Sequence, residues 1–332
     1  MIRNNSLYIP TMADISTSML HPLSPIEEKL LTIPGVSPLT YEDEQMLRDS
    51  FSKKSIQYAH SFLYFLRASH GKHGSLGYKF ISKEIKTIIG YRNNIIYITP
   101  ICDTTQGEKL AIFCDKIFQK TGSCILLKKF SKRKYPKLHF ADSIKLTADE
   151  LEDDTCPETV LNLPTLFVTP EGAINRKAKR FFRKVKRFKK LNLHFDIIED
   201  LTQIPIENVI KFLKEDDGKS ESFLPIVTYL YSHGQDDRYE TTIFLHKGIV
   251  QGLYIIEKFS PKEVGLYTAV TTKNQPGITE WMDHHVFQEM FFEGIQKIYF
   301  GGAENEGIDY YIKKLLPERT KYFVQTVAYK NK

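Results

Sequence analysis

The sequence lacks several features that would assign it to common classes of protein. It contains no run of about 18 apolar residues, so no membrane-spanning helix is expected. The N-terminus lacks the basic-then-apolar layout of a secretory signal. The four cysteines (Cys102, Cys114, Cys124 and Cys156) show neither C-x-x-C spacing nor the paired histidines of a zinc site. We therefore expect a cytoplasmic protein with reduced thiols and without a bound metal.

Signatures of familiar enzyme classes are also missing. The chain has no G-x-S-x-G, no P-loop and no dinucleotide-binding G-x-G-x-x-G. The pair His284-His285 does not indicate a metal site either, because adjacent residues on a helix point about 100° apart and cannot share one metal ion. We interpret these two histidines as ordinary residues of a helix surface.

The composition is that of a globular protein of two ordinary domains. The chain has 332 residues, of which 42% are hydrophobic and 12% aromatic. We expect an N-terminal arm over residues 1–38 with one short helix near 25–31, a first module over 39–165 and a second over 166–332. The net charge of +6 is unevenly spread, with basic clusters at 128–137 and 176–190, and such segregation favours a polyanionic partner.

One structural unit occurs twice. It begins at Tyr97 and again at Leu266, and each copy has an apolar strand, a polar loop ending in glycine, a helical stretch, a second glycine and another strand. The closing glycines, Gly122 and Gly294, stand where a helix end needs a left-handed residue. A unit of this length predicts a crossover between parallel strands, and therefore two similar α/β modules with mixed sheets. In the second module we expect three antiparallel strands before the crossover.

A strongly basic helix is predicted over residues 174–190, at the entrance to the second module. We expect its apolar stripe to be buried. The rest of its surface is almost entirely lysine and arginine, although like charges at i,i+4 destabilise a helix. Nucleic-acid phosphates, an anionic membrane surface and a solvated face neutralised by acidic neighbours all fit this pattern. The residues that we expect to meet a nucleic acid are Arg176, Lys177, Arg180, Arg183, Lys184 and Arg187.

Two loops of the second module carry the groups best suited to chemistry. After an apolar strand, Gly301 and Gly302 let a ligand approach the backbone, and Glu304 and Glu306 near the next helix start suit an amine. The other loop contains Lys273, Asn274 and Gly277 and precedes the second helix of the repeat. Backbone amides at such a helix start bind an anion or an oxyanion.

The whole pattern resembles a known fold family. Tandem modules, the segment INRKAKRFFRKVKRFKKLNLHFDII and the closing segment IYFGGAENEGIDYYIKKLLP resemble the tandem GNAT fold, best over residues 173–329. This form of the fold occurs in Fem-type aminoacyl-tRNA-dependent transferases and in the C-terminal domain of lysyl-phosphatidylglycerol synthase.

The resemblance implies an acyltransferase that moves an aminoacyl group from aminoacyl-tRNA to an amine-bearing acceptor. For this reaction we expect Lys273 or nearby backbone amides to stabilise the developing oxyanion, Glu304 to steer the amine, and the hydroxyls of Tyr267 and Tyr310 to position the substrates. Coenzyme A remains possible as the acyl carrier, although the R/Q-x-x-G-x-G/A loop that binds it is missing. The alternatives are an acyl-CoA-dependent N-acyltransferase and a non-catalytic protein on this fold that binds RNA or anionic lipid.

Overall fold

The structure is a computed structural model of the chain. It describes residues 23–51, 61–70, 76–92, 95–101, 107–130, 146–152, 158–167, 178–215, 220–234, 236–301, 306–315, 318–320 and 323–327. Among them, no helix has both the length and the apolar character needed to cross a bilayer.

Two seven-stranded mixed sheets organise the chain. The first sheet has the strand order β1-β2-β3-β4-β5-β14-β6, and the second has the order β13-β7-β12-β11-β10-β9-β8. The strands of the first sheet are β1 (Val36–Pro38), β2 (Leu76–Ile81), β3 (Lys86–Arg92), β4 (Ile95–Pro100), β5 (Cys124–Phe130), β6 (Leu146–Glu152) and β14 (Phe323–Val327). Those of the second are β7 (Glu158–Asn162), β8 (Asp196–Ile198), β9 (Tyr239–His246), β10 (Ile249–Ser260), β11 (Glu263–Thr271), β12 (Lys297–Gly301) and β13 (Glu318–Thr320).

The repeat predicted from the sequence is confirmed as a pair of crossovers. In the first copy, β4 pairs in parallel with β5, and α5 (Gly107–Thr121) connects them; in the second, β11 pairs in parallel with β12 through α10 (Ile278–Phe292). Gly122 and Gly294 have φ angles of 68° and 90°, the left-handed conformation that ends each helix. The expected antiparallel run β9, β10 and β11 is confirmed as well.

The two sheets have the same strand order once the two halves of the chain are aligned, and each contains one strand from the other half. β7 ends the first half but lies between β12 and β13 of the second sheet. β14 ends the second half but lies between β5 and β6 of the first sheet. The exchange is reciprocal, so each sheet is completed by a segment that is distant in sequence.

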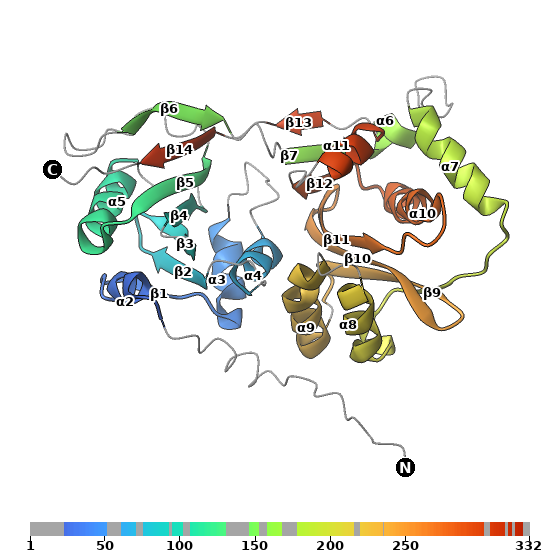
Figure 1. Cartoon of the computed structure of the whole chain (residues 1–332), viewed down its shortest axis with the longest axis horizontal. Helices are drawn as coiled ribbons and strands as arrows, with labels where there is room; N and C mark the ends of the chain where they lie inside the picture. The colour runs from blue at the N-terminus through green and yellow to red at the C-terminus, as the bar shows by residue number, and fades with distance from the viewer. Residues whose placement is uncertain are drawn as a thin grey trace, which may run out of the picture.

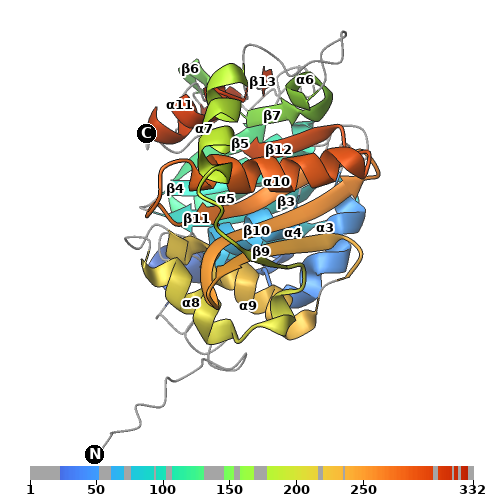
Figure 2. The same ribbon diagram turned by 90° about the vertical axis from the view of Figure 1, so that its right-hand side faces the viewer.

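Helices cover both sheets and meet in a core that the two modules share. On the outer faces lie α2 (Pro25–Leu31) and α5 on the first sheet, and α6 (Leu163–Phe167), α7 (Lys179–Lys189) and α10 on the second (Figures 1 and 2). The shared core joins α3 (Glu44–Ser50) and α4 (Phe62–His70) to α8 (Ile206–Glu215), α9 (Leu224–His233) and the inner face of the second sheet. The last helix is α11 (Glu306–Lys313), and short 3-10 turns occur at Tyr41–Asp43, Leu201–Gln203 and Ser220–Phe223.

The described part of the predicted arm is built into the first module. Helix α2 begins where the sequence predicts, because Ser24 and Glu27 form a capping box and Pro25 occupies its first turn. Leu30 is fully buried in the outer core of the first sheet, and β1 pairs with β2. Chain segments also cross the expected boundary at residue 165, since β7 belongs to the second sheet and β14 to the first. Both differences arise from pairing between segments remote in sequence.

Candidate functional site

Two neighbouring parallel strands of the second sheet separate at their carboxyl ends. β11 and β12 pair only from Glu263 with Lys297 to Gly265 with Tyr299, and β11 then continues to Thr271 paired with β10. β12 instead remains paired with β7 as far as Gly301. In open α/β sheets, ligands bind outside the carboxyl ends of the strands, where neighbouring connections diverge. The two loops chosen from the sequence follow these two strand ends.

The loop after β11 leads into the start of α10. Gly277 caps this helix with a φ of 90°, and a Cβ at this position would lie 3.0 Å from the backbone oxygen of Lys184 on α7. Glycine is therefore required both for the turn and for the close contact of the two helices. Lys273 and Asn274 are exposed in this loop, and the Asn274 amide donates to the Gln251 Oε1 at 3.1 Å.

The loop after β12 is described only at its borders. Gly301 ends the strand with a φ of 73°, and α11 begins at Glu306. Gly302 and Glu304 lie outside the described residues, as does the side chain of Glu306. The roles predicted for these residues remain predictions.

A buried carboxylate ties α10, α11 and β10 together beside this strand end. Asp283 on α10 accepts a hydrogen bond from the Tyr254 hydroxyl at 2.5 Å and a second one from the Tyr311 hydroxyl. Burial raises the pKa of Asp283 to about 6, although both hydrogen bonds act to lower it. This cluster holds α11 against α10.

Most of the positive charges on the basic face of α7 have no acidic partner among the described residues. The predicted stripe is confirmed, with Phe181, Val185 and Phe188 buried against α10. Lys184 forms an ion pair with the buried Glu280, at 2.6 Å between Nζ and Oε1. Among the residues that the structure describes, Lys184 is the one cation of α7 that pairs with a carboxylate. This finding disfavours the interpretation that acidic neighbours neutralise the helix.

The predicted site residues do not all converge. Arg180, Arg183 and Arg187 are exposed on α7 as expected, whereas Arg176 and Lys177 lie outside the described residues. Tyr267 is only 2% exposed and belongs to the shared core, on the face of the second sheet opposite to α10. Tyr310 is exposed on α11, where the Lys314 amine lies 4.7 Å from its ring centre.

A second buried polar cluster joins the two modules. Glu257 on β10 lies 3.6 Å from the Arg48 guanidinium of α3 and accepts a hydrogen bond from Ser61. Burial raises the pKa of Glu257 to about 7, opposed by Arg48 and Ser61. Glu44 accepts from Arg48, Tyr229 and Tyr239, and these hydrogen bonds outweigh its burial and lower its pKa. The cluster fastens α3 to the second sheet.

Sequence reasoning missed both buried acids, although each leaves a signal. Glu257 interrupts the apolar run of β10, where a lone acid needs a partner from elsewhere in the fold. Asp283 stands three residues after Glu280 on α10, so both acids share one helix side, and both are buried. His284 is also less exposed than expected: its ring packs against Phe167, Phe181 and Phe182, and burial lowers its pKa to about 4.

The residues described offer little that suits a metal ion. No group of three or more His, Cys, Asp or Glu side chains converges among them. The described polar groups of the loop after β11 are instead Lys273, Asn274 and the backbone amides at the start of α10.

Comparison with known proteins relates the fold to a defined group of structures. No protein-family model matches the sequence, and no curated protein matches it significantly. A conserved Bacteroides thetaiotaomicron protein of unknown function has a TM-score of 0.69 at 9% identity, over 88% of this chain and 99% of the other. L-PGS from Bacillus licheniformis gives 0.60 at 12% identity, over 89% and 94%, and FemX gives 0.53 at 10%, over 89% and 97%. The chain has the tandem α/β fold of L-PGS and FemX, which the sequence resemblance had predicted.

Proposed function

We propose that this protein is an acyltransferase that moves an aminoacyl group from aminoacyl-tRNA to an amine-bearing acceptor. The observation that carries the proposal is the divergence of β11 and β12 next to an uncompensated basic helix. The strand ends offer a place for the reacting groups, and α7 offers charge for a long polyanion. The resemblance to Fem-type transferases suggests which polyanion is used.

The chemistry requires little covalent help from the protein. The amine nitrogen attacks the ester carbonyl, a C–N bond forms, the C–O bond to the ribose breaks, and the ribose hydroxyl receives the proton that the amine loses. Because the ester is already activated, placing the amine against the carbonyl supplies much of the rate. The start of α10 and Lys273 are suited to stabilise the oxyanion, and Glu304 is suited to hold the amine.

A direct test measures transfer from charged tRNA. Bulk tRNA carrying radiolabelled amino acids is incubated with the protein and with either phosphatidylethanolamine vesicles or soluble amines, and both deacylation and labelled product are counted. We expect deacylation that depends on the protein and on an acceptor. Glu304→Gln and Lys273→Ala are each expected to slow it by about 10- to 1,000-fold.

The control variant is Lys262→Ala, an exposed lysine in the turn between β10 and β11, and it should leave the rate unchanged. A protein that deacylates no charged tRNA with any acceptor contradicts the proposal. Transfer from acetyl-CoA in a parallel reaction would instead favour the acyl-CoA alternative.

The basic face of α7 is expected to supply RNA affinity. Replacing Arg180, Arg183 and Arg187 together by glutamine should weaken tRNA binding at least about tenfold at 0.1 M salt. Each contact between a cation and a phosphate releases counterions, and the variant loses three such contacts. The slope of log affinity against log salt should fall by about three. Fluorescence anisotropy with labelled tRNA at several salt concentrations measures both quantities.

The matched control removes three exposed cations from α5, the crossover helix of the first module. Lys109→Gln, Lys116→Gln and Lys120→Gln change the net charge by the same amount. If this variant loses as much affinity and slope as the α7 variant, binding depends on overall charge and the assignment to α7 is wrong.

A further inference from the structure

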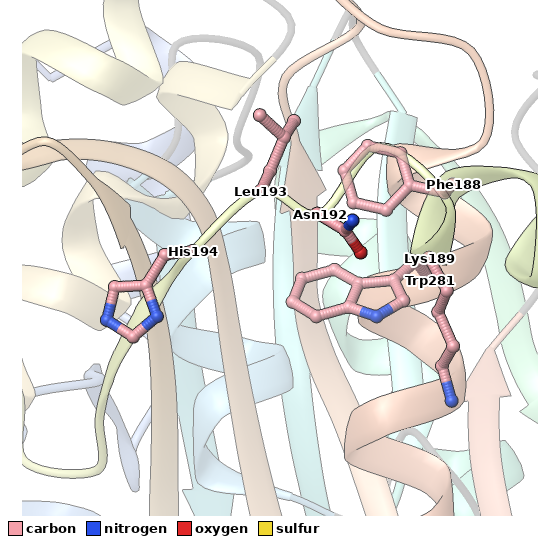
Figure 3. A pocket seen from close by; sticks show the side chains of 6 residues that line it. All are labelled: Phe188, Lys189, Asn192, Leu193, His194 and Trp281. Carbon is pink, nitrogen blue, oxygen red and sulfur yellow. The ribbon is translucent and has the colours of Figure 1, made fainter.

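A hollow of about 320 Å³ lies where the last turn of α7 meets the first turn of α10 (Figure 3). Its lining side chains are Phe188, Lys189, Asn192, Leu193, His194 and Trp281. The volume is at the lower end of the ~300–1,000 Å³ typical of small-ligand sites. None of these lining residues belongs to the loops that follow β11 and β12.

Trp281 lies at the centre of this hollow and is held firmly (Figure 3). The ring centre of Trp281 lies 5.3 Å from that of Phe188 and 4.9 Å from that of Phe195. Phe244 meets the indole edge-on at 5.7 Å, and His285 stacks at 6.2 Å. The indole is therefore a half-buried platform that is packed against four neighbouring aromatic rings.

The turn that closes the hollow is equally well defined. α7 ends in hydrogen bonds from the amides of Lys190, Leu191 and Asn192 to carbonyls of its last turn. Asn192 then adopts a left-handed φ of 49°, which asparagine tolerates better than most residues. This conformation places a side-chain amide, both a donor and an acceptor, in the lining of the hollow.

The rim of the hollow is positive. Lys189 lines it, and Lys186, Arg187 and Lys190 are exposed on the same end of α7. An acid also lies beside this rim: the Asp196 carboxylate is 3.3 Å from the mostly exposed His194 ring. A ligand with a planar aromatic part and a negatively charged backbone fits both the platform and the rim.

We propose that this hollow binds one unstacked base of an RNA whose phosphates follow α7. The inference rests on the proposed function, because it concerns the same RNA, but it assigns a distinct subsite. Proteins bind unpaired nucleotides by stacking the base on an aromatic side chain and by pairing the phosphates with cations. Asn192 adds the hydrogen-bonding capacity needed to meet a base edge.

The sequence itself provides the probe, because Trp281 is the single tryptophan of the chain. Fluorescence excited at 295 nm therefore reports on this hollow alone. We expect a single-stranded hexaribonucleotide to quench it in a saturable manner. An abasic hexamer with the same number of phosphates should bind more weakly and should not quench.

Variants separate stacking from charge. Trp281→Leu is expected to lower the affinity for the labelled hexamer by about 5- to 100-fold in an anisotropy assay, while affinity for the abasic hexamer stays unchanged. Trp281→Phe keeps an aromatic plane and should retain most of the affinity, which also controls for folding. Lys189→Gln should weaken both oligomers alike.

Several results would overturn the subsite. Equal quenching by the abasic hexamer would show that the hollow holds phosphate only, and quenching by phosphatidylglycerol vesicles but not by RNA would assign it to lipid. Absence of quenching by any RNA would remove it. These readouts are independent of acyl transfer, so a protein that deacylates tRNA without quenching retains the proposed function and loses only this subsite.

Discussion

Replacing Arg48 by methionine is expected to lower the free energy of unfolding by about 3–5 kcal/mol at pH 8. At that pH both Glu257 and Glu44 are ionised, and the substitution removes the cation, 13% exposed, that lies beside them. The methionine fills similar space, so the loss comes from uncompensated charge. Urea unfolding followed by Trp281 fluorescence and by circular dichroism measures it.

The pH dependence of this effect has a definite sign. Burial raises the pKa of Glu257 from 4.5 to about 7, so the folded protein holds this proton more tightly than the unfolded chain does. The stability that this carboxyl contributes is complete below pH 4.5 and is lost as the pH rises to about 7, on the order of 3 kcal/mol. The deficit of Arg48→Met should therefore shrink from pH 8 to pH 5, where Glu257 is protonated.

Two comparisons test the cause. Adding Glu257→Gln to Arg48→Met should restore part of the stability at pH 8, because the buried negative charge of Glu257, which lost its cation, is then removed. Lys211→Met removes an exposed cation with a 3.9 Å contact to Glu215 and should change the free energy of unfolding by less than about 1 kcal/mol. An Arg48→Met deficit that does not change with pH would contradict the role assigned to Glu257.

Replacing Gln325 by proline is expected to destabilise both modules together, by at least about 3 kcal/mol. Gln325 pairs with Leu127 of β5 on one side and Glu150 of β6 on the other, so β14 is an interior strand. Proline removes a backbone donor from this ladder and is excluded from interior strands. The reciprocal exchange of β7 and β14 should pass the loss to the second module.

Trp281 fluorescence reports whether the two modules unfold together, because Trp281 belongs to the second module while Gln325 belongs to the first sheet. In Gln325→Pro, the urea midpoint of Trp281 fluorescence should fall together with that of circular dichroism. Gln325→Ala keeps the backbone donor and should behave nearly like the native chain. A Trp281 midpoint that stays in place while part of the circular dichroism is lost would show that the modules unfold independently.

Some site features could be read from residue patterns, and others could not. The basic face of α7, the glycine at the start of α10 and the glycine at the end of β12 follow from local spacing, so their positions agree with expectation. The sequence predicts that the Tyr267 hydroxyl positions a substrate. In the fold it points into the shared core, because the alternation along β11 assigns it to the face opposite to α10.

The sequence by itself determined the repeated strand–helix–strand units, their parallel pairing, the antiparallel run before the second crossover and the buried stripe of α7. These features depend on periodicity and on glycine conformations within about 30 residues, which local chemistry specifies. Only the tertiary structure decided the exchange of β7 and β14, the pairing of Arg48 with Glu257 and the hollow around Trp281. Each of these joins segments far apart in the chain, and no spacing rule specifies which buried acid meets which distant donor.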